Sequence, residues 1–286
     1  KAATLALKGD VYLWSGKVLE GGDADFTEAR SALGQVTGFT LVPYASLWGQ
    51  SNESNNEFIF AFDYQKDQAE NFYSNFTGRA VDVGPLFDDA GNSMTAFTVN
   101  GASRFGPTDK SLLMLDDVND HRRKTFIRLY TNAAGHIPYS AGSPAYKGSI
   151  LNKFVGVVDA NQRRSWNNIP LYRYADVVLM LAEAKNNLGE DPSDEINLVR
   201  QRAYGTNYDP LIHGFANSTP LDNAKAILDE RFKEFAGEGK RWWDLVRAGS
   251  TFVFDEVVAI NPDEAYKIYY SISPAMIADD PELEQT

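Results

Sequence analysis

Several aromatic residues lie beside amide side chains in polar stretches of the sequence. Trp166 is followed by Asn167, and both Tyr73 and Trp48 have asparagine or glutamine two residues away. A sugar ring binds by laying its C–H face on a flat aromatic ring while amide groups reach its hydroxyls. We therefore expect some of these rings to be partly exposed and to bind sugar, while burial as a loop anchor is the more common role for any single ring. The candidate ligand-binding residues are Trp166, Tyr73, Trp48, Tyr139, Tyr146 and Asn167.

Metal and nucleophile chemistry find little support in the sequence. The chain has no cysteine and only three histidines, at 121, 136 and 213, none at ligand spacing to another. Asp88–Asn92 is rich in oxygen ligands but lacks the spacing of a calcium-binding EF-hand loop. His121 has no nucleophile or orienting acid near it in sequence. We therefore expect no metal, no cofactor and no catalytic residue.

The overall charge narrows the classes of partner. The 286 residues include 27 basic and 39 acidic side chains, which gives a net charge of −12. Nucleic acid and anionic lipid would both be repelled, so neither is expected as a direct partner. A hydrophobic share of 43% with 13% aromatic residues is typical of a globular protein with a large core.

Helical patterns at both ends of the chain must position the aromatic residues. Apolar residues recur at helical spacing over 1–19 and 25–36. Gly9 and Tyr12 in the first helix, with Ala29 and Leu33 in the second, fit the small-and-large pattern of a tetratricopeptide helix pair. Residues 171–188 and the helix that follows Pro192 predict a second pair. The fold class expected is mainly α: tetratricopeptide-like helix pairs that form a helical scaffold.

The middle of the chain is irregular and contains all the candidate rings. Residues 57–64 alternate as a half-buried strand, and residues 125–130 predict another. Clusters of Gly, Ser, Asn and Pro separate them, which indicates a loop-rich layer on a rigid helical base. Aromatic residues of its loops include Tyr44, Trp48, Phe72, Tyr73, Phe76, Phe105, Tyr139, Tyr146 and Trp166. We divide the chain into a first helix pair (1–39), a loop-rich ligand-binding layer (40–168) and a C-terminal helical scaffold (169–286).

Residues 227–247 predict two helices joined by a tight corner. Thr219 followed by proline gives a start signal, and Gly237 and Gly239 break the pattern. Trp242 and Trp243 then begin the next helix. A double tryptophan at helical spacing favours a place in the core over a ligand-stacking surface.

Motifs in this region resemble those of the SusD/RagB family of bacterial surface nutrient-binding lipoproteins. The stretch E-R-F-K-E-F-A-G-E-G-K-R-W-W-D-L-V-R at 230–247 is similar to the family signature. Residues 172–184, 197–203 and 280–285 resemble three further family motifs in the same order. Ala236-Gly237 and Asp176 depart from the family pattern. The resemblance extends over most of residues 1–286 and is strongest from about 170 onward.

The resemblance implies a function and partners. Family members bind glycans at the cell surface without catalysis and pass them to a SusC-like TonB-dependent transporter. The resemblance also implies an outer-membrane location through a lipid anchor that is not present in this chain. It further implies an additional N-terminal portion that holds part of the ligand site. Peptide cargo within the same family, a glycoside hydrolase, and a plain helical-repeat interaction module are the alternatives. Two carboxyl groups ~5–9 Å apart across a cleft would favour the hydrolase.

Overall fold

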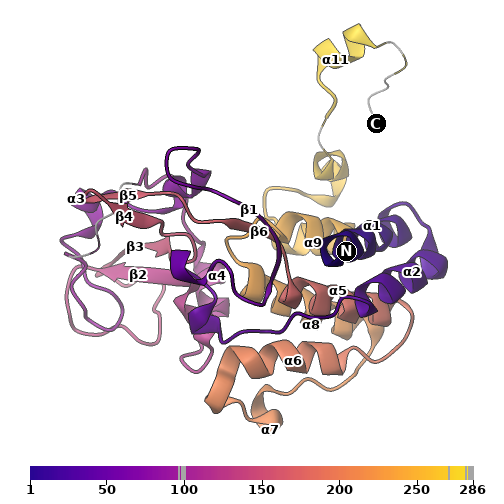
Figure 1. Cartoon of the computed structure of the whole chain (residues 1–286), viewed down its shortest axis with the longest axis horizontal. Helices are drawn as coiled ribbons and strands as arrows, with labels where there is room; N and C mark the ends of the chain where they lie inside the picture. The colour runs from indigo at the N-terminus through magenta and orange to yellow at the C-terminus, as the bar shows by residue number, and fades with distance from the viewer. Residues whose placement is uncertain (96, 98–100, 270, 281, 283–286) are drawn as a thin grey trace.

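A helical scaffold and a loop-rich layer lie side by side in the protein (Figure 1). The computed structural model describes residues 1–95, 97, 101–269, 271–280 and 282. The scaffold helices are α1 Ala2–Val18, α2 Gly22–Gly34, α5 Tyr174–Asn187, α6 Ser193–Tyr204, α7 Pro210–His213, α8 Pro220–Phe235, α9 Arg241–Ala248 and α10 Ser250–Glu256. The layer contains β1 Phe58–Phe62, α3 Ala80–Val83, α4 Asp109–Met114, β2 Phe126–Tyr130, β3 Tyr146–Leu151, β4 Val157–Asp159, β5 Gln162–Arg164 and β6 Ile169–Arg173. The predicted fold class is confirmed.

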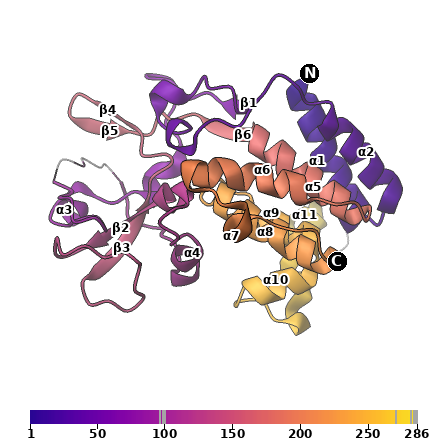
Figure 2. The same cartoon turned by 90° about the horizontal axis from the view of Figure 1, so that it is seen from below.

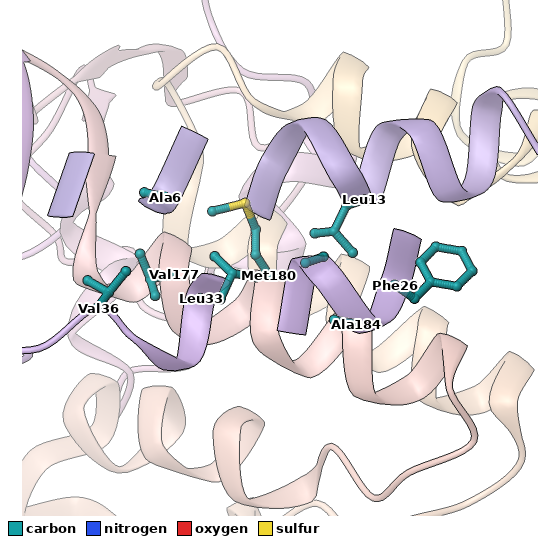
Figure 3. Close-up of a cluster of buried hydrophobic side chains, with 9 residues drawn as sticks. Ala6, Leu13, Phe26, Leu33, Val36, Val177, Met180 and Ala184 are labelled. Carbon is teal, nitrogen blue, oxygen red and sulfur yellow. The ribbon is translucent and has the colours of Figure 1, made fainter. Parts of the chain in front are cut away.

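The helices of the first pair approach each other closely because glycines of α1 face large side chains of α2. A Cβ atom at Gly9 would lie 2.4 Å from the Leu33 side chain, and one at Gly16 would lie 2.6 Å from the Phe26 ring. The expected small-and-large packing of this helix pair is therefore confirmed, and the structure places Gly9 against Leu33. Helix α5 closes the third side of this core, which is centred on Leu13 and Met180 (Figure 3).

The second helix pair begins later than the pattern predicts. Residues 169–173 form strand β6, so helix α5 begins at Tyr174 rather than at residue 171. Strand β6 pairs antiparallel with β1, with Phe62 opposite Ile169. This pairing connects the start of the loop-rich layer directly to the scaffold. The other two sheets are also two-stranded: β2 with β3, and β4 with β5.

The tight corner forms between α8 and α9. Thr219 caps α8 by accepting a hydrogen bond from the Asp222 amide, and Pro220 is its first residue. Gly237 at φ +84 adopts the left-handed conformation that a side chain would strain. Trp243, however, is 50% exposed, and its ring meets the edge of Trp14 at 6.0 Å. The core prediction is wrong for Trp243, because α9 buries Leu245 and Val246 on its other face.

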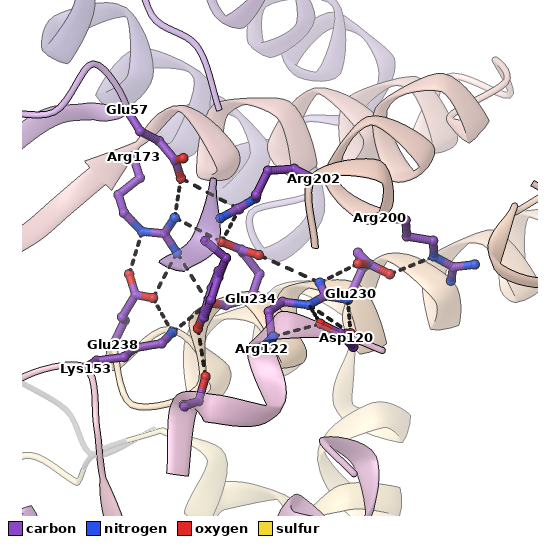
Figure 4. A network of polar contacts seen from close by, with 12 residues as sticks. Glu57, Asp120, Arg122, Lys153, Arg173, Arg200, Arg202, Glu230, Glu234 and Glu238 are labelled. Atoms are coloured by element: carbon purple, nitrogen blue, oxygen red, sulfur yellow. Dashed lines mark hydrogen bonds and ion pairs between the residues drawn. The ribbon is translucent and has the colours of Figure 1, made fainter. Parts of the chain in front are cut away.

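A network of charged side chains lies at the boundary between the layer and the scaffold (Figure 4). We call this group the joint cluster. Its members are Glu57, Asp120, Arg122, Lys153, Arg173, Arg202, Glu230, Glu234 and Glu238, all buried or almost so.

Each buried arginine of the joint cluster has several carboxylate partners. Arg122 pairs with Asp120 at 2.7 Å and also with Glu230 at 2.5 Å. Arg173 contacts Glu234 at 3.0 Å and Glu238 at 2.9 Å. Burial alone would lower the pKa of Arg173, but these carboxylates raise it well above its usual range. Paired in this way, buried charges are tolerated, whereas a single unpaired one would be costly.

Candidate functional site

A groove of about 430 Å³ opens on the loop-rich layer beside strand β3. We call it the β3 groove. Its walls combine flat rings with side chains that can donate or accept hydrogen bonds, the mixture that a sugar requires. The aromatic wall consists of Phe76, Phe105 and Tyr146, and the polar wall of Thr77, Asp82, Ser103, Arg104, Asp109, Lys147 and Ser149.

Three phenylalanine rings form a ridge that runs out of the groove onto the surface. Phe105 is 58% exposed and Phe72 is 57% exposed, while Phe76 lies half-buried between them. The ring centres of Phe76 and Phe105 are 5.3 Å apart, and those of Phe72 and Phe76 are 6.4 Å apart. Exposed rings in contact with one another are unusual on a protein surface and mark sites of interaction. We call Phe72, Phe76 and Phe105 the aromatic ridge.

Backbone hydrogen bonds hold the segment that presents Phe105. The amides of Arg104 and Phe105 both donate to the carbonyl of Asn75, at 3.0 and 3.2 Å, and the amide of Ser103 donates to that of Thr77. Gly101 permits this close approach, because a Cβ atom there would lie 2.2 Å from the Thr77 carbonyl oxygen. The ridge is therefore fixed by main-chain contacts between two segments.

Strand β2 positions the opposite wall through a buried arginine. The Arg128 guanidinium donates to the carbonyls of Leu112 at 2.9 Å and Leu115 at 3.0 Å, which holds the end of helix α4. The first residue of that helix, Asp109, lines the groove and accepts a hydrogen bond from the Tyr139 hydroxyl at 2.6 Å. The Tyr139 ring in turn meets the edge of Tyr146 at 5.2 Å.

Tyr146 is the sequence-predicted residue that lies in the β3 groove. It is half-buried, and its hydroxyl shares a hydrogen bond with Ser149 at 2.9 Å. Tyr139 lies directly behind it but is only 5% exposed. Burial, together with the bond to Asp109, raises the pKa of Tyr139, so its hydroxyl stays protonated and keeps donating.

The expected exposure is wrong for Tyr73, Tyr139 and Trp166, which are all buried. The Tyr73 ring stacks on Phe154 at 4.1 Å, and its hydroxyl donates to the Gly237 carbonyl at 2.7 Å. The Tyr139 hydroxyl likewise has an internal partner, the Asp109 carboxylate, and the ammonium of Lys66 lies over the Trp166 ring. Tyr73 still lies under the aromatic ridge, stacked on Phe72 at 4.6 Å.

Trp48 and Asn167 lie outside the groove. Trp48 is half-buried and packs edge-on to Phe154 at 5.3 Å, with the ammonium of Lys153 over its ring. Asn167 is buried, and its side-chain oxygen accepts a hydrogen bond from the Gly156 amide at 2.6 Å. The structure thus brings Tyr146 and Tyr139 together and separates them from Trp48, Trp166 and Asn167. Contact of any of these residues with a ligand stays a prediction.

The sequence reasoning passed over Phe72 and Phe105, the most exposed rings of the ridge. The candidate rings are all tyrosine or tryptophan, whose polar atoms also find partners in a core, although Phe72 itself directly follows Asn71. Phenylalanine has no polar atom that needs a partner, so its exposure depends only on packing. The available signal was the local sequence, since Phe105 stands between Arg104 and Gly106 rather than in an apolar run.

The described residues add two negative findings. Within the ranges given above, no group of histidine and acidic side chains is placed to hold a metal ion. In the same ranges, no helix is long and apolar enough to cross a membrane. The predicted motif at 280–285 lies largely outside the described residues.

The family of the chain follows from comparison with known proteins. The chain combines a tetratricopeptide-like helical scaffold with a loop-rich layer. The model of the SusD family matches residues 127–270, so the chain belongs to the SusD family. The resemblance drawn from the motifs is thereby confirmed.

Relatives and solved structures agree with this assignment. SusD-like protein P25 of Formosa agariphila is 27% identical over 252 residues, which cover 79% of this chain and 46% of that protein. The structure of Bacteroides fragilis NanU matches all of this chain with a TM-score of 0.85 at 32% identity. A surface glycan-binding protein A from Bacteroides thetaiotaomicron, in complex with laminarihexaose, matches 99% of the chain with a TM-score of 0.62 at 21% identity, a likeness in fold.

The chain spans only part of the length of these proteins. It covers 62% of the NanU chain and 63% of the glycan-binding protein. Among curated relatives it covers about half of SusD-like protein P25, at 46%.

Proposed function

We propose that this chain binds an oligosaccharide in the β3 groove and on the aromatic ridge, without altering it. The observation that carries the proposal is the pair of exposed rings, Phe72 and Phe105, that continue into a groove with polar walls. The C–H face of a sugar lies on the rings, and hydroxyls reach Ser103, Arg104 and Ser149. The laminarihexaose complex of a protein with the same fold supports glycan as the ligand class.

The proposal assigns different roles to the tyrosines. Tyr146 contacts the sugar, since it lines the groove. Tyr139 holds Tyr146 and Asp109 in place, and Tyr73 supports the aromatic ridge from below. Within the whole protein, we extend the proposal to a cell-surface lipoprotein that delivers glycan to a TonB-dependent transporter, on the basis of family membership.

The test removes one exposed ring. Phe105→Ala is expected to weaken binding to a glycan that the wild type retains by about tenfold, because the sugar loses its stacking surface. Affinity electrophoresis against a panel of plant, mucin and microbial glycans measures this. Phe62→Ala is the matched control, because Phe62 on β1 is 51% exposed and does not line the groove. Equal binding by Phe105→Ala and wild type would contradict the proposed site.

Peptide is the second candidate ligand. Sheet β1–β6 has only two strands, so β1 has one edge that no other named strand of the described residues covers. An extended peptide can add to such an edge through main-chain hydrogen bonds. Retention of peptides but of no glycan on the panel would favour this candidate. Release of shorter sugars by pure protein, abolished in Asp109→Asn, would instead indicate a hydrolase.

A further inference from the structure

Two cationic side chains of the β3 groove have no side-chain partner among the residues that the structure describes. They are Arg104 and Lys147, both exposed and both part of the polar wall. Most other cations that line the cavities of the described chain are engaged. Arg231 and Lys240 pair with Asp176, Lys153 with Glu238, and Arg247 with Glu183.

The acidic groups of the same groove already accept hydrogen bonds from other side chains of the protein. Asp82 accepts two hydrogen bonds from the Arg79 guanidinium, at 2.7 and 3.0 Å. Asp109 accepts one from the Tyr139 hydroxyl at 2.6 Å. With Arg79 balancing Asp82, the groove therefore has more positive than negative charge, on a chain whose net charge is −12.

The backbone holds both cations at the groove. Arg104 precedes Phe105 in the segment bonded to Asn75, so the Arg104 side chain leaves the backbone next to the residue that carries the exposed ring. Lys147 has no cross-strand partner: Leu129 pairs with Gly148 and Tyr130 with Tyr146, so Lys147 is the extra residue of a β-bulge. Bulges redirect a side chain out of the regular alternation of a strand, and they are frequent at functional sites.

We infer that the β3 groove selects acidic sugars, in which a carboxylate or sulfate ester binds Arg104 and Lys147 while the ring lies on Phe105. This inference rests on the proposed function and specifies its ligand class. An arginine guanidinium matches the two oxygens of a carboxylate or sulfate in a paired geometry, and the lysine ammonium adds a second charge-assisted bond. A neutral sugar would leave both cations without a partner of opposite charge.

The experiment compares anionic glycans with their neutral counterparts on the same protein. The probes are an oligogalacturonate and its carboxyl-reduced form, and a sulfated galactan oligosaccharide and its desulfated form. Calorimetry is expected to show that the wild type prefers at least one anionic probe by about tenfold over its neutral counterpart. The preference should shrink as salt is added, because exposed charges are screened. The two pairs distinguish a carboxylate site from a sulfate site, and either result supports the inference.

Four variants separate this inference from the proposed function. Arg104→Gln and Lys147→Gln should each weaken the anionic probe more than its neutral counterpart, so that the preference for the anionic probe shrinks. Phe105→Ala should weaken both members of each pair alike. Lys225→Gln, which removes an exposed cation on α8, is the charge-matched control and should change neither. Equal affinity for anionic and neutral probes, with loss of both in Phe105→Ala, would overturn the acidic-sugar inference and retain glycan binding. Unaltered binding in Phe105→Ala would overturn the binding site itself.

Discussion

Four tyrosine hydroxyls in this protein donate hydrogen bonds that connect distant segments of the chain. Tyr73 donates to the Gly237 carbonyl, Tyr139 to Asp109, Tyr172 to Asp10 and Tyr204 to Asp117. Burial is the largest cause of the raised pKa of each hydroxyl, which therefore remains a donor at every physiological pH. A tyrosine can thus be buried in a polar stretch of sequence at little cost, because its one polar group is satisfied.

At the scale of one residue, Asp176 should make stability depend on pH. Burial alone would raise its pKa, but Lys240 at 2.7 Å and Arg231 at 2.9 Å more than offset this and lower it to about 2. A carboxylate whose pKa is lowered on folding stabilises the protein above its unfolded pKa of about 4, and that stability is lost as the pH falls toward 2. We expect the group to contribute about 2 kcal/mol at neutral pH.

Urea unfolding between pH 6 and pH 3 tests this expectation. The free energy of unfolding of the wild type should fall more steeply on acidification than that of Asp176→Asn, because the variant has no proton to bind at this site. The difference in slope should appear below about pH 4. Parallel curves for the two proteins would show that Asp176 has no lowered pKa in the folded state.

Residue types explain why the fold was more predictable from sequence than the site. The helix pairs follow from apolar spacing and from small residues such as Gly9 among large ones, which are local signals. The burial of Tyr73 depends on Gly237, 164 residues away, and that of Tyr139 on Asp109. Conversely, Phe105 is exposed only because its segment is bonded to Asn75. No local pattern contains these partners, so exposure of individual rings could not be predicted.

At the scale of elements, the contact between α1 and α2 depends on glycine. Gly9→Ala should destabilise the protein by about 1–3 kcal/mol, because the added Cβ meets Leu33 at 2.4 Å and the helices must separate. This is opposite in sign to the gain of about 1 kcal/mol that alanine normally gives in a helix interior. Thermal unfolding followed by circular dichroism measures the change.

Gly34→Ala in the partner helix is the control for this experiment. No atom lies within 4 Å of a Cβ placed there, so the change should be neutral or slightly stabilising. If Gly9→Ala were as stable as Gly34→Ala, the helix pair would have more freedom to adjust than a close-packed interface allows.

Strand β6 shows that strand pairing can override a helical sequence pattern. Residues 171–173 continue the apolar pattern of α5, yet they form a strand because β1 supplies an antiparallel partner. Two residues of this short segment contact different parts of the protein. Tyr172 donates a hydrogen bond to Asp10 on α1, while Arg173 pairs with Glu234 in the joint cluster. A single-sequence pattern does not show which long-range partner is available.

At the scale of the whole molecule, the joint cluster is one of the connections between the layer and the scaffold. Glu234 is fully buried among Arg173, Arg202 and Arg122. Burial would raise its pKa, but the three arginines lower it, so it remains ionised. Glu234→Gln should cost about 3–5 kcal/mol, because it leaves buried guanidinium charge uncompensated.

A surface substitution of the same type provides the comparison. Glu190→Gln removes the partner of Arg30 in a pair whose side chains are 39% and 40% exposed, and it should cost less than about 1 kcal/mol. Urea unfolding of both variants measures the difference. Equal stability of the two would mean that the joint cluster adds no more than an exposed ion pair.

The sequence positions of the joint cluster bear on the order in which the chain folds. Glu57 and Arg173 are 116 residues apart, and Arg122 and Glu230 are 108 apart. Such distant segments meet only after long loops close, whereas α1 and α2 form from neighbouring residues. We expect the helix pairs to be native-like in the folding transition state and the charge pairs to form after it. Substitutions in the joint cluster should then accelerate unfolding and leave the folding rate almost unchanged.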